Sequence, residues 1–135
     1  MSDKCFVDTN LWIYLYSEDK RATTVERLVD KHFHQVIIST QVLGECYSAM
    51  IRKRLCTPDR ATNIIDSLME SFEVAVISVP TVKRAVGIQR RYGFSYYDSQ
   101  MIAAALEQGC AILYSEDMHH GQVLEGSLTI INPFQ

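Results

Sequence analysis

The sequence has few cysteines and no spacing that would pair them. Its 135 residues include four, which are widely separated and form no Cys-x-x-Cys motif: Cys5, Cys46, Cys56 and Cys110. All but Cys56 lie within apolar segments. Such a distribution is typical of buried thiols in a reducing compartment, and it argues against a disulfide framework or a zinc site.

The sequence also lacks the long apolar segments of membrane and exported proteins. No apolar run approaches the roughly 20 residues that a membrane helix needs. Residues Met1–Cys5 show neither the apolar region nor the cleavage site of a signal peptide. No linker, repeat or low-complexity segment divides the chain. We therefore expect a cytoplasmic protein without a membrane partner, folded as a single domain over residues 1–135.

A basic excess, which would mark a simple nucleic-acid binder, is missing too. The formal net charge is −3. The charge is uneven, however: residues 52–91 hold eight basic and four acidic residues, whereas the rest of the chain holds five basic and twelve acidic residues. This basic middle section would steer a polyanion toward an acidic site. Alternatively, its Lys and Arg residues are solvated helix ends that complement helix dipoles.

Short apolar segments alternate with amphipathic ones along the chain. The pattern predicts strands at 5–7, 36–38, 74–77, 111–114 and 128–131, and helices at 11–16, 21–33, 40–50, 58–68, 80–92 and 96–108. The strands are mostly apolar on both faces, which favours a parallel sheet covered by helices on each side. The expected fold class is therefore α/β, a three-layer α/β/α sandwich with a central, mainly parallel, four- to five-stranded sheet. Ligands bind such sheets at the carboxyl ends of the strands.

Acidic residues follow two of the expected strands. Asp8 comes directly after strand 5–7, and Asp117 comes shortly after strand 111–114. Since parallel strands end at the same edge of a sheet, both carboxylates belong to that edge. Each also has a purely structural interpretation, because Asp8 could cap the next helix and Asp117 could be a turn residue.

Two further acids lie on expected helices. Glu45 borders the apolar stripe of its helix, where it would be partly desolvated unless paired or metal-bound, or else it turns out to solvent. Its neighbour Gly44 is a poor helix residue, which suggests that another group approaches closely. Asp98 completes the capping box Ser95-x-x-Asp98, and the same residue could also line the site.

The conjunction of these acids points to a cation. Three or four carboxylates at one sheet edge would repel each other strongly in a desolvated cleft. Ligand sets made of oxygen alone suit Mg²⁺ or Mn²⁺ better than Zn²⁺. Mg²⁺ held by carboxylates can activate water and neutralise charge on a phosphodiester. The candidate catalytic and metal-binding residues are therefore Asp8, Glu45, Asp98 and Asp117.

Four stretches of the chain share their order and spacing with one known family. They are Phe6–Asn10, Glu45, Phe94–Ser99 running into Ala103–Ala105, and Leu113–Met118. Over nearly its whole length the sequence resembles the PIN-domain family, and within it the VapC-type toxins of bacterial toxin–antitoxin pairs.

The resemblance implies a PIN-like fold and roles for particular residues. The principal metal-site acids would be Asp8, Glu45 and Asp98, completed by Asp117 in preference to its neighbour Glu116, with Thr9, Asn10 and Ser115 in support. The implied activity is a Mg²⁺- or Mn²⁺-dependent endoribonuclease that acts on structured RNA such as transfer or ribosomal RNA. The implied partners are a VapB-like antitoxin, whose C-terminal segment covers the site, and a second copy of the chain in a homodimer.

Two other features have simpler interpretations. His119 and His120 are adjacent, and neighbours on one segment rarely reach the same metal, so we expect solvated loop residues. The alternating Trp12, Tyr14 and Tyr16 could stack on bases, or could serve core packing and a dimer surface.

Three other function classes fit less well. A haloacid-dehalogenase-like phosphatase needs a second Asp two residues after its nucleophile, where this chain has Asn10. A response-regulator receiver domain needs an acidic pair near the first strand, which here supplies only Asp8. A catalytically inactive PIN-fold binding module could have lost any of the four acids, yet all four are present.

Overall fold

The computed structural model describes residues 3–135, so Met1 and Ser2 of the N-terminal segment lie outside it. Its elements, in chain order, are β1 (Cys5–Val7), α1 (Thr9–Leu15), α2 (Ala22–Lys31), a 3₁₀ turn η1 (Phe33–Gln35), β2 (Val36–Ser39), α3 (Thr40–Arg52), α4 (Pro58–Ser71), β3 (Glu73–Ala75), α5 (Val79–Tyr92), α6 (Tyr96–Glu107), β4 (Ile112–Tyr114), β5 (Val123–Leu124) and β6 (Leu128–Ile131). Among these residues, no helix combines the length and apolar character needed to cross a bilayer.

The strands form one sheet in the order β3-β2-β1-β4-β6-β5. All neighbouring pairs are parallel except β5 and β6, which form an antiparallel hairpin. The chain builds outward from β1 to β3 and then returns to the other side of β1 with β4. The strand order therefore reverses between β1 and β4. In open parallel sheets, this reversal leaves a crevice at the carboxyl ends of the strands, where ligands bind.

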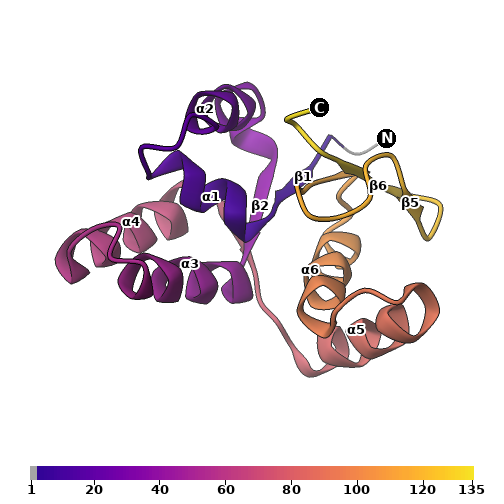
Figure 1. The fold of residues 1–135 in the computed structure, drawn as a ribbon. Helices are drawn as coiled ribbons and strands as arrows, with labels where there is room; N and C mark the ends of the chain where they lie inside the picture. The colour runs from indigo at the N-terminus through magenta and orange to yellow at the C-terminus, as the bar shows by residue number, and fades with distance from the viewer. Residues whose placement is uncertain (1–2) are drawn as a thin grey trace.

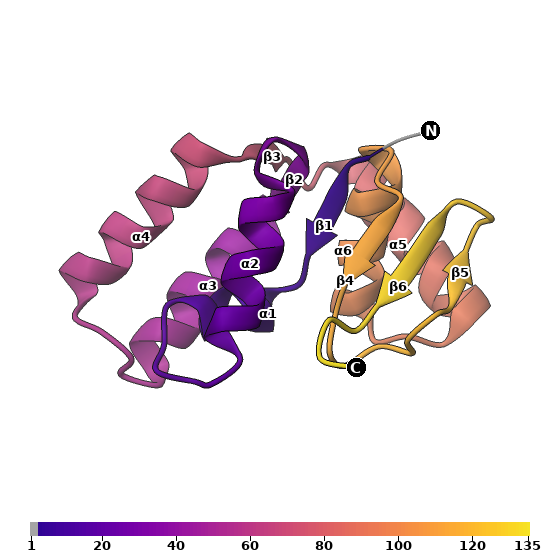
Figure 2. The same cartoon turned by 90° about the horizontal axis from the view of Figure 1, so that it is seen from above.

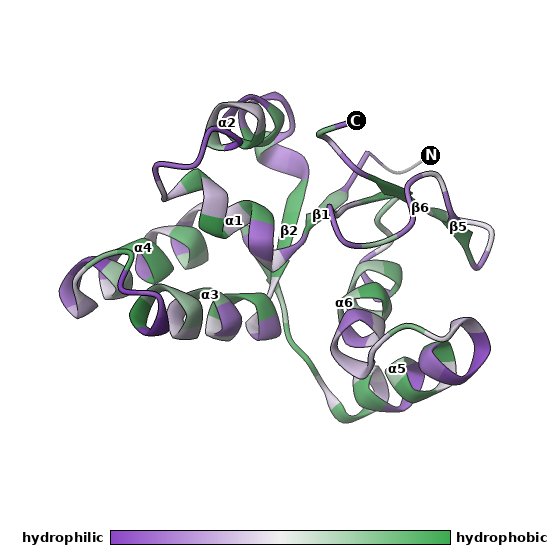
Figure 3. Ribbon diagram, viewed as in Figure 1, coloured by the Kyte–Doolittle hydropathy of each residue, from purple (hydrophilic) through white to green (hydrophobic). Residues whose placement is uncertain are grey.

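Helices cover the sheet as the sequence predicts for an α/β sandwich. Figure 1 shows α1 to α4 gathered on one side of β1 and β2, with α5 and α6 packed together under the C-terminal strands. Figure 2, from above, shows β1 running between these two groups of helices. The residues of β1 and β2 are all buried. Hydrophobic residues concentrate on the strands and on the inner faces of the helices (Figure 3). The helices therefore bury the sheet, as is usual for parallel strands.

The prediction of four to five strands is wrong by one strand, because β5 has no readable apolar pattern. It contains two residues, and Val123 is exposed. A tight turn pairs it with β6, and two residues of that turn, Glu125 and Gly126, have positive φ angles of 50° and 69°. The hairpin geometry, rather than burial of alternate side chains, makes this edge strand.

The third strand begins and ends earlier than the predicted 74–77. Its partner β2 ends at Ser39, where α3 begins, so nothing remains for Val76 to pair with, and Val76 is 69% exposed. The backbone N–H of Ile77 donates instead to Thr40 Oγ1 at 3.1 Å. The apolar run in the sequence therefore extends beyond the end of β3 at Ala75.

Two glycines illustrate the difference between a helix interior and a helix end. Gly44 lies within α3, and a Cβ added there would meet no other atom within 4 Å, so the expectation of close approach by another part of the protein is wrong. Gly93 follows α5 with φ of 83°, and a Cβ there also meets nothing within 4 Å. The two sites thus differ in backbone conformation and not in available space.

We predict opposite effects for the same substitution at these two positions. Gly44→Ala should raise the free energy of unfolding by about 0.5–1 kcal/mol, because Ala restricts the unfolded chain and favours the helix. Gly93→Ala should lower it by about 1–2 kcal/mol, because a left-handed backbone is strained for any residue with a Cβ. Urea unfolding of both variants beside the unmodified protein measures this. A destabilised Gly44→Ala would contradict the open surroundings of Gly44.

Candidate active site

Asp8 lies at the strand-order reversal, directly after β1. The backbone N–H of Asp8 donates to the carbonyl of Tyr114 at 3.0 Å, which fixes it beside the end of β4. Its side chain makes no capping hydrogen bond to α1, so the helix-cap interpretation is wrong. Instead, the Ser115 hydroxyl donates to Asp8 Oδ2 at 2.8 Å. Asp8 as a whole is only 4% exposed, so the fold holds it in the crevice rather than in solvent.

The surroundings of Asp8 disfavour its charge. Burial raises the pKa of Asp8 from 3.8 to about 7, although the hydrogen bond from Ser115 opposes the shift. The nearby carboxylates of Asp98 and Asp117 raise it further. Asp8 therefore needs either a proton or a cation close by to be stable in this position.

Glu45 reaches the same crevice from α3. The Thr9 hydroxyl donates to Glu45 Oε1 at 2.7 Å, which draws this carboxylate toward the start of α1 and away from solvent. The Gln41 amide lies 3.4 Å from Glu45 Oε2 and also donates to the Tyr97 carbonyl at 3.1 Å. Gln41 therefore links Glu45 to the first turn of α6, a contact that sequence reasoning missed because it joins residues 56 positions apart.

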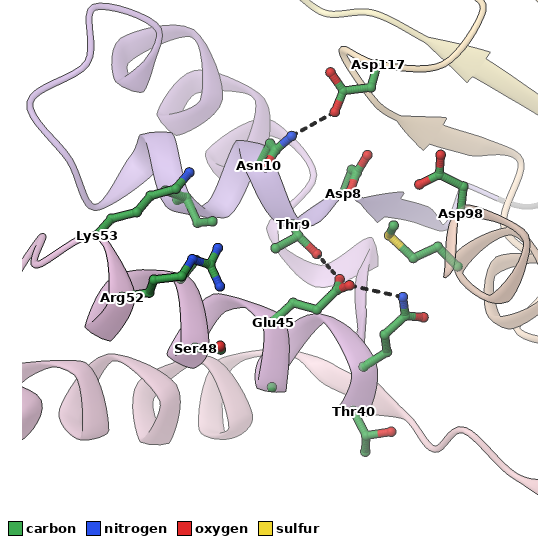
Figure 4. A pocket seen from close by; sticks show the side chains of 15 residues that line it. Asp8, Thr9, Asn10, Thr40, Glu45, Ser48, Arg52, Lys53, Asp98 and Asp117 are labelled. Carbon is green, nitrogen blue, oxygen red and sulfur yellow. Dashed lines mark hydrogen bonds between the residues drawn. The ribbon is translucent and has the colours of Figure 1, made fainter. Parts of the chain in front are cut away.

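Asp98 lies in the first turn of α6, on the opposite wall. Its backbone N–H donates to the Ser95 hydroxyl at 3.1 Å, so Ser95 caps the helix as predicted. Only this half of the capping box is formed, and the carboxylate points toward Asp8 (Figure 4). Burial raises the pKa of Asp98, and the carboxylates of Asp117 and Glu45 add to the shift. The first turn of α6 therefore serves as both cap and site wall.

Asp117 is exposed and lies in the loop after β4. The Asn10 amide donates to Asp117 Oδ2 at 2.7 Å. The adjacent Glu116 turns away, because Arg21 donates to both of its oxygens at 2.7 and 3.1 Å. Arg21 in turn stacks 3.8 Å from the ring centre of Tyr14. This ion pair removes Glu116 from the crevice and supports the choice of Asp117 over its neighbour.

All four predicted acids line one pocket with a volume of ≈ 580 Å³ (Figure 4). Thr9 and Asn10 line it too, while Ser115 acts from beneath through Asp8. The remaining lining residues were not singled out by the sequence analysis as parts of the site: Ile13, Thr40, Gln41, Gly44, Ser48, Ala49, Arg52, Lys53 and Met101. Those on α3 recur at intervals of about three to four residues, which the sequence shows. The sequence does not show which other elements form the opposite wall of the pocket.

The donor set suits a hard cation that keeps part of its hydration shell. None of the four acids takes part in any of the four ion pairs between described residues. Within residues 3–135, no three His, Cys, Asp or Glu side chains are grouped tightly enough to form a ready-made ligand cage. Mg²⁺ commonly binds through one or two carboxylates and several waters, so this spread of oxygen donors fits it better than it fits Zn²⁺.

Other candidate residues lie outside the pocket. His119 and His120 are exposed, and His120 Nδ1 accepts a hydrogen bond from the backbone of Asn132 at 2.9 Å. Trp12 is a core residue that donates to the Val7 carbonyl at 3.0 Å, so it offers no stacking surface. The cysteines are free thiols, buried except for the half-buried Cys56, as expected.

Comparisons with known proteins identify relatives of this fold. A family model described as the PIN domain matches residues 5–123. No curated protein matches the chain. Among solved structures, similar ones include a toxin from Mycobacterium tuberculosis that cleaves the sarcin–ricin loop, with a TM-score of 0.72, 23% identity, and coverage of 84% of this chain and 90% of that one.

Two complexes are also similar. A toxin–antitoxin complex from Klebsiella pneumoniae has a TM-score of 0.74 at 18% identity, over 96% of this chain and 98% of that one. A DNA-bound VapBC complex from Salmonella typhimurium has a TM-score of 0.72 at 16% identity, over 96% and 97% of the two chains. At these identities the likeness establishes a shared fold.

The raised pKa of Asp8 predicts a pH-dependent stability in metal-free protein. The folded state binds a proton at Asp8 up to about pH 7, whereas the unfolded chain releases it near pH 4, so stability should fall as pH rises between these values. The full effect corresponds to about 4 kcal/mol. Urea unfolding in EDTA between pH 5 and pH 8 should show this decline, and Asp8→Asn should remove most of it.

The matched control is Asp30→Asn, which changes an exposed carboxylate on α2. The stability of this variant should fall with rising pH as steeply as that of the unmodified protein. An Asp8→Asn variant that lost stability just as steeply would show that Asp8 is not the group that titrates.

Proposed function

The chain belongs to the PIN-domain family, and from this premise we propose that it is a ribonuclease dependent on Mg²⁺ or Mn²⁺. Its catalytic and metal-binding residues are Asp8, Glu45, Asp98 and Asp117. One observation carries the proposal: these four acids line a single pocket at the strand-order reversal, without a basic partner among the described residues. The raised pKa of the buried Asp8 adds to it.

Neutral donors prepare the acids for a cation. Ser115 holds Asp8, Thr9 holds Glu45 and Asn10 holds Asp117, each by one hydrogen bond of 2.7–2.8 Å. Such bonds orient the carboxylates without cancelling their charge, which a Lys or Arg partner would do. A bound Mg²⁺ or Mn²⁺ would supply an activated water and offset charge on the phosphodiester. The roles of Thr9, Asn10 and Ser115 are thus to fix the acids in place.

We propose RNA as the substrate and toxin as the biological role. The similar structure from Mycobacterium tuberculosis is a toxin that cleaves the sarcin–ricin loop, and the Klebsiella and Salmonella structures are toxin–antitoxin complexes. They support this chain as the toxin of a type II toxin–antitoxin system, with structured RNA such as transfer or ribosomal RNA as target. The expected homodimer stays a prediction.

The acidic pocket also indicates how a VapB-like antitoxin would inhibit the protein. An Arg fork matches carboxylate geometry, and its guanidinium would occupy the space that a cation needs. The antitoxin segment would therefore place a basic side chain among Asp8, Glu45 and Asp98. Excess Mg²⁺ should compete with that segment.

Cleavage products test the proposed chemistry. With Mg²⁺ or Mn²⁺, the protein should cut RNA to leave 5′-phosphate and 3′-hydroxyl ends, because an activated water attacks phosphorus and the ribose 2′-hydroxyl is not needed. Asp98→Asn should lose more than the roughly 10- to 100-fold that removing an outer partner of a metal site costs. Asp66→Asn, an exposed acid on α4, is the matched control. End-group analysis and cleavage rates measure both.

Two results would argue against the proposal. Cyclic-phosphate ends that persist in EDTA would show a different mechanism. The RNA could also stay intact with every metal tested, although Mg²⁺ or Mn²⁺ raises the melting temperature of the protein. That result would favour the alternative of a catalytically inactive PIN-fold binding module.

Expression in bacteria tests the toxin role. The unmodified protein should arrest growth when produced alone, and Asp8→Ala should abolish the arrest, because the deeply buried acid of the site is lost. Asp98→Ala, at a less buried position, gives the same test should Asp8→Ala fold poorly. A folded variant of either kind that remained as toxic as the unmodified protein would place the toxicity elsewhere.

A further inference from the structure

The pocket has an acidic end and a basic end, joined by one face of α3. Glu45, Ser48, Ala49 and Arg52 are spaced by three, one and three residues, so they share a side of the helix, and all four line the pocket. Lys53, which follows the last residue of α3, lines it too. Figure 4 shows the side chains of Arg52 and Lys53 on the same side of α3 as the carboxylate of Glu45.

This basic pair is not committed to any partner within the described chain. Both residues are exposed, and no ion pair or side-chain hydrogen bond between residues 3 and 135 includes either of them. No other basic residue of the middle section 52–91 lines the pocket. Arg91 is paired with Glu125 at 3.0 Å, and Lys83 and Arg84 belong to α5, which contributes nothing to the pocket lining.

We propose that Arg52 and Lys53 form a phosphate-binding subsite for the RNA backbone, an inference that rests on the proposed function. Four carboxylates that line one pocket repel a polyanion, and a basic end of the same pocket would offset that repulsion. Arg can grip a phosphate through two parallel hydrogen bonds, while Lys adds a compact charge.

The length of α3 sets which phosphate this subsite holds. Arg52 comes seven positions after Glu45, which corresponds to about 10 Å along the helix at about 1.5 Å per residue. Successive phosphates of one strand rise about 3.4 Å in a duplex and lie farther apart in an extended strand. The subsite therefore binds a phosphate roughly one to three nucleotides from the phosphate that reaches the acids. Phosphate contacts position a strand without reading its sequence, so the pair contributes affinity and register.

Position at the end of a helix offers another account of these residues. Basic side chains at a helix C-terminus complement the helix dipole, and this would need no RNA. The two accounts differ in what salt does to RNA binding, because only a phosphate contact releases counterions from the nucleic acid.

The experiment compares the double variant Arg52→Gln/Lys53→Gln with the control Lys83→Gln/Arg84→Gln, an adjacent basic pair exposed on α5. Binding of a labelled eight-nucleotide single-stranded RNA is followed by fluorescence anisotropy in EDTA, which prevents cleavage, across a series of salt concentrations. The pocket variant should bind about 10-fold more weakly at low salt. Its plot of log affinity against log salt should be shallower by about 0.7–1.4, since each neutralised phosphate of a single strand contributes about 0.7. The control should match the unmodified protein.

Three further measurements separate the subsite from the catalytic acids and from the fold. The rise in melting temperature with Mg²⁺ should be unchanged in the pocket variant, because the acids remain. Arg52→Lys should keep the salt slope, since it keeps the charge. A DNA strand of the same sequence should lose affinity to the same extent, because a phosphate contact does not use the 2′-hydroxyl. Single Gln variants, each with about half the slope change, replace the double variant if it does not fold.

The outcomes distinguish the subsite from the proposed function. If the unmodified protein binds and cleaves RNA, and the pocket variant keeps its affinity and slope, the subsite is overturned and the ribonuclease stands. If the pocket variant loses affinity while its slope stays unchanged, Arg52 and Lys53 act through the structure of α3 and not on phosphate. A protein that neither binds nor cleaves RNA overturns both.

Discussion

The burial of Asp8 at the carboxyl end of a central strand is the constraint around which the site is arranged. The carboxylate of a residue that is 4% exposed is poorly solvated by bulk water, and the fold gives it a hydroxyl from Ser115 and no basic residue. The strand-order reversal makes this placement possible, because it puts the ends of β1 and β4 side by side and leaves the space above them open. A group that is unfavourable when charged is thereby held where a cation or a proton must accompany it.

The rest of the site is built to preserve that imbalance of charge. Thr9 and Asn10, which follow Asp8 in the sequence, each reach a different distant acid, so one short segment organises three carboxylates. Arg21 reaches the loop after β4, but it is committed to Glu116 and stacks on Tyr14. Arg21 is thus held away from the acids by its ion pair with Glu116, and the carboxylates of Asp8, Glu45 and Asp117 are held by neutral donors.

The chain has a net charge of −3, but its charges are unevenly placed around the pocket. Most of its basic residues are scattered or paired elsewhere, but α3 carries two of them to the far end of the pocket that holds the acids. Because α3 presents Glu45 at one turn and Arg52 two turns later, it spans the acidic and the basic end of the pocket. The overall charge of the protein says little about its substrate, since the field within the pocket is set by these few side chains.

The sequence by itself determined the α/β fold and singled out the four acids that line one pocket. Strands such as Cys5–Val7 and Val36–Ile38 are apolar throughout, and only burial on both faces explains such runs. The cap Ser95 marks the start of α6 through local chemistry, so it was readable in advance. Ser39 and Ser78 cap α3 and α5 by the same local rule. Asp8 and Asp117 could be assigned to one sheet edge because parallel strands share their polarity.

Contacts between distant parts of the chain were decided only by the tertiary structure. The sequence left Asp98 open between cap and site, and the orientation of its side chain toward Asp8 depends on how α6 packs against the sheet. The withdrawal of Glu116 needs Arg21, 95 residues away. The β5 strand exists because a turn brings two residues against β6. The basic end of the pocket depends on where α3 ends relative to α1. Local patterns record which residues prefer burial or a helix end, but they carry no distance between elements, and electrostatic pairing depends on distance.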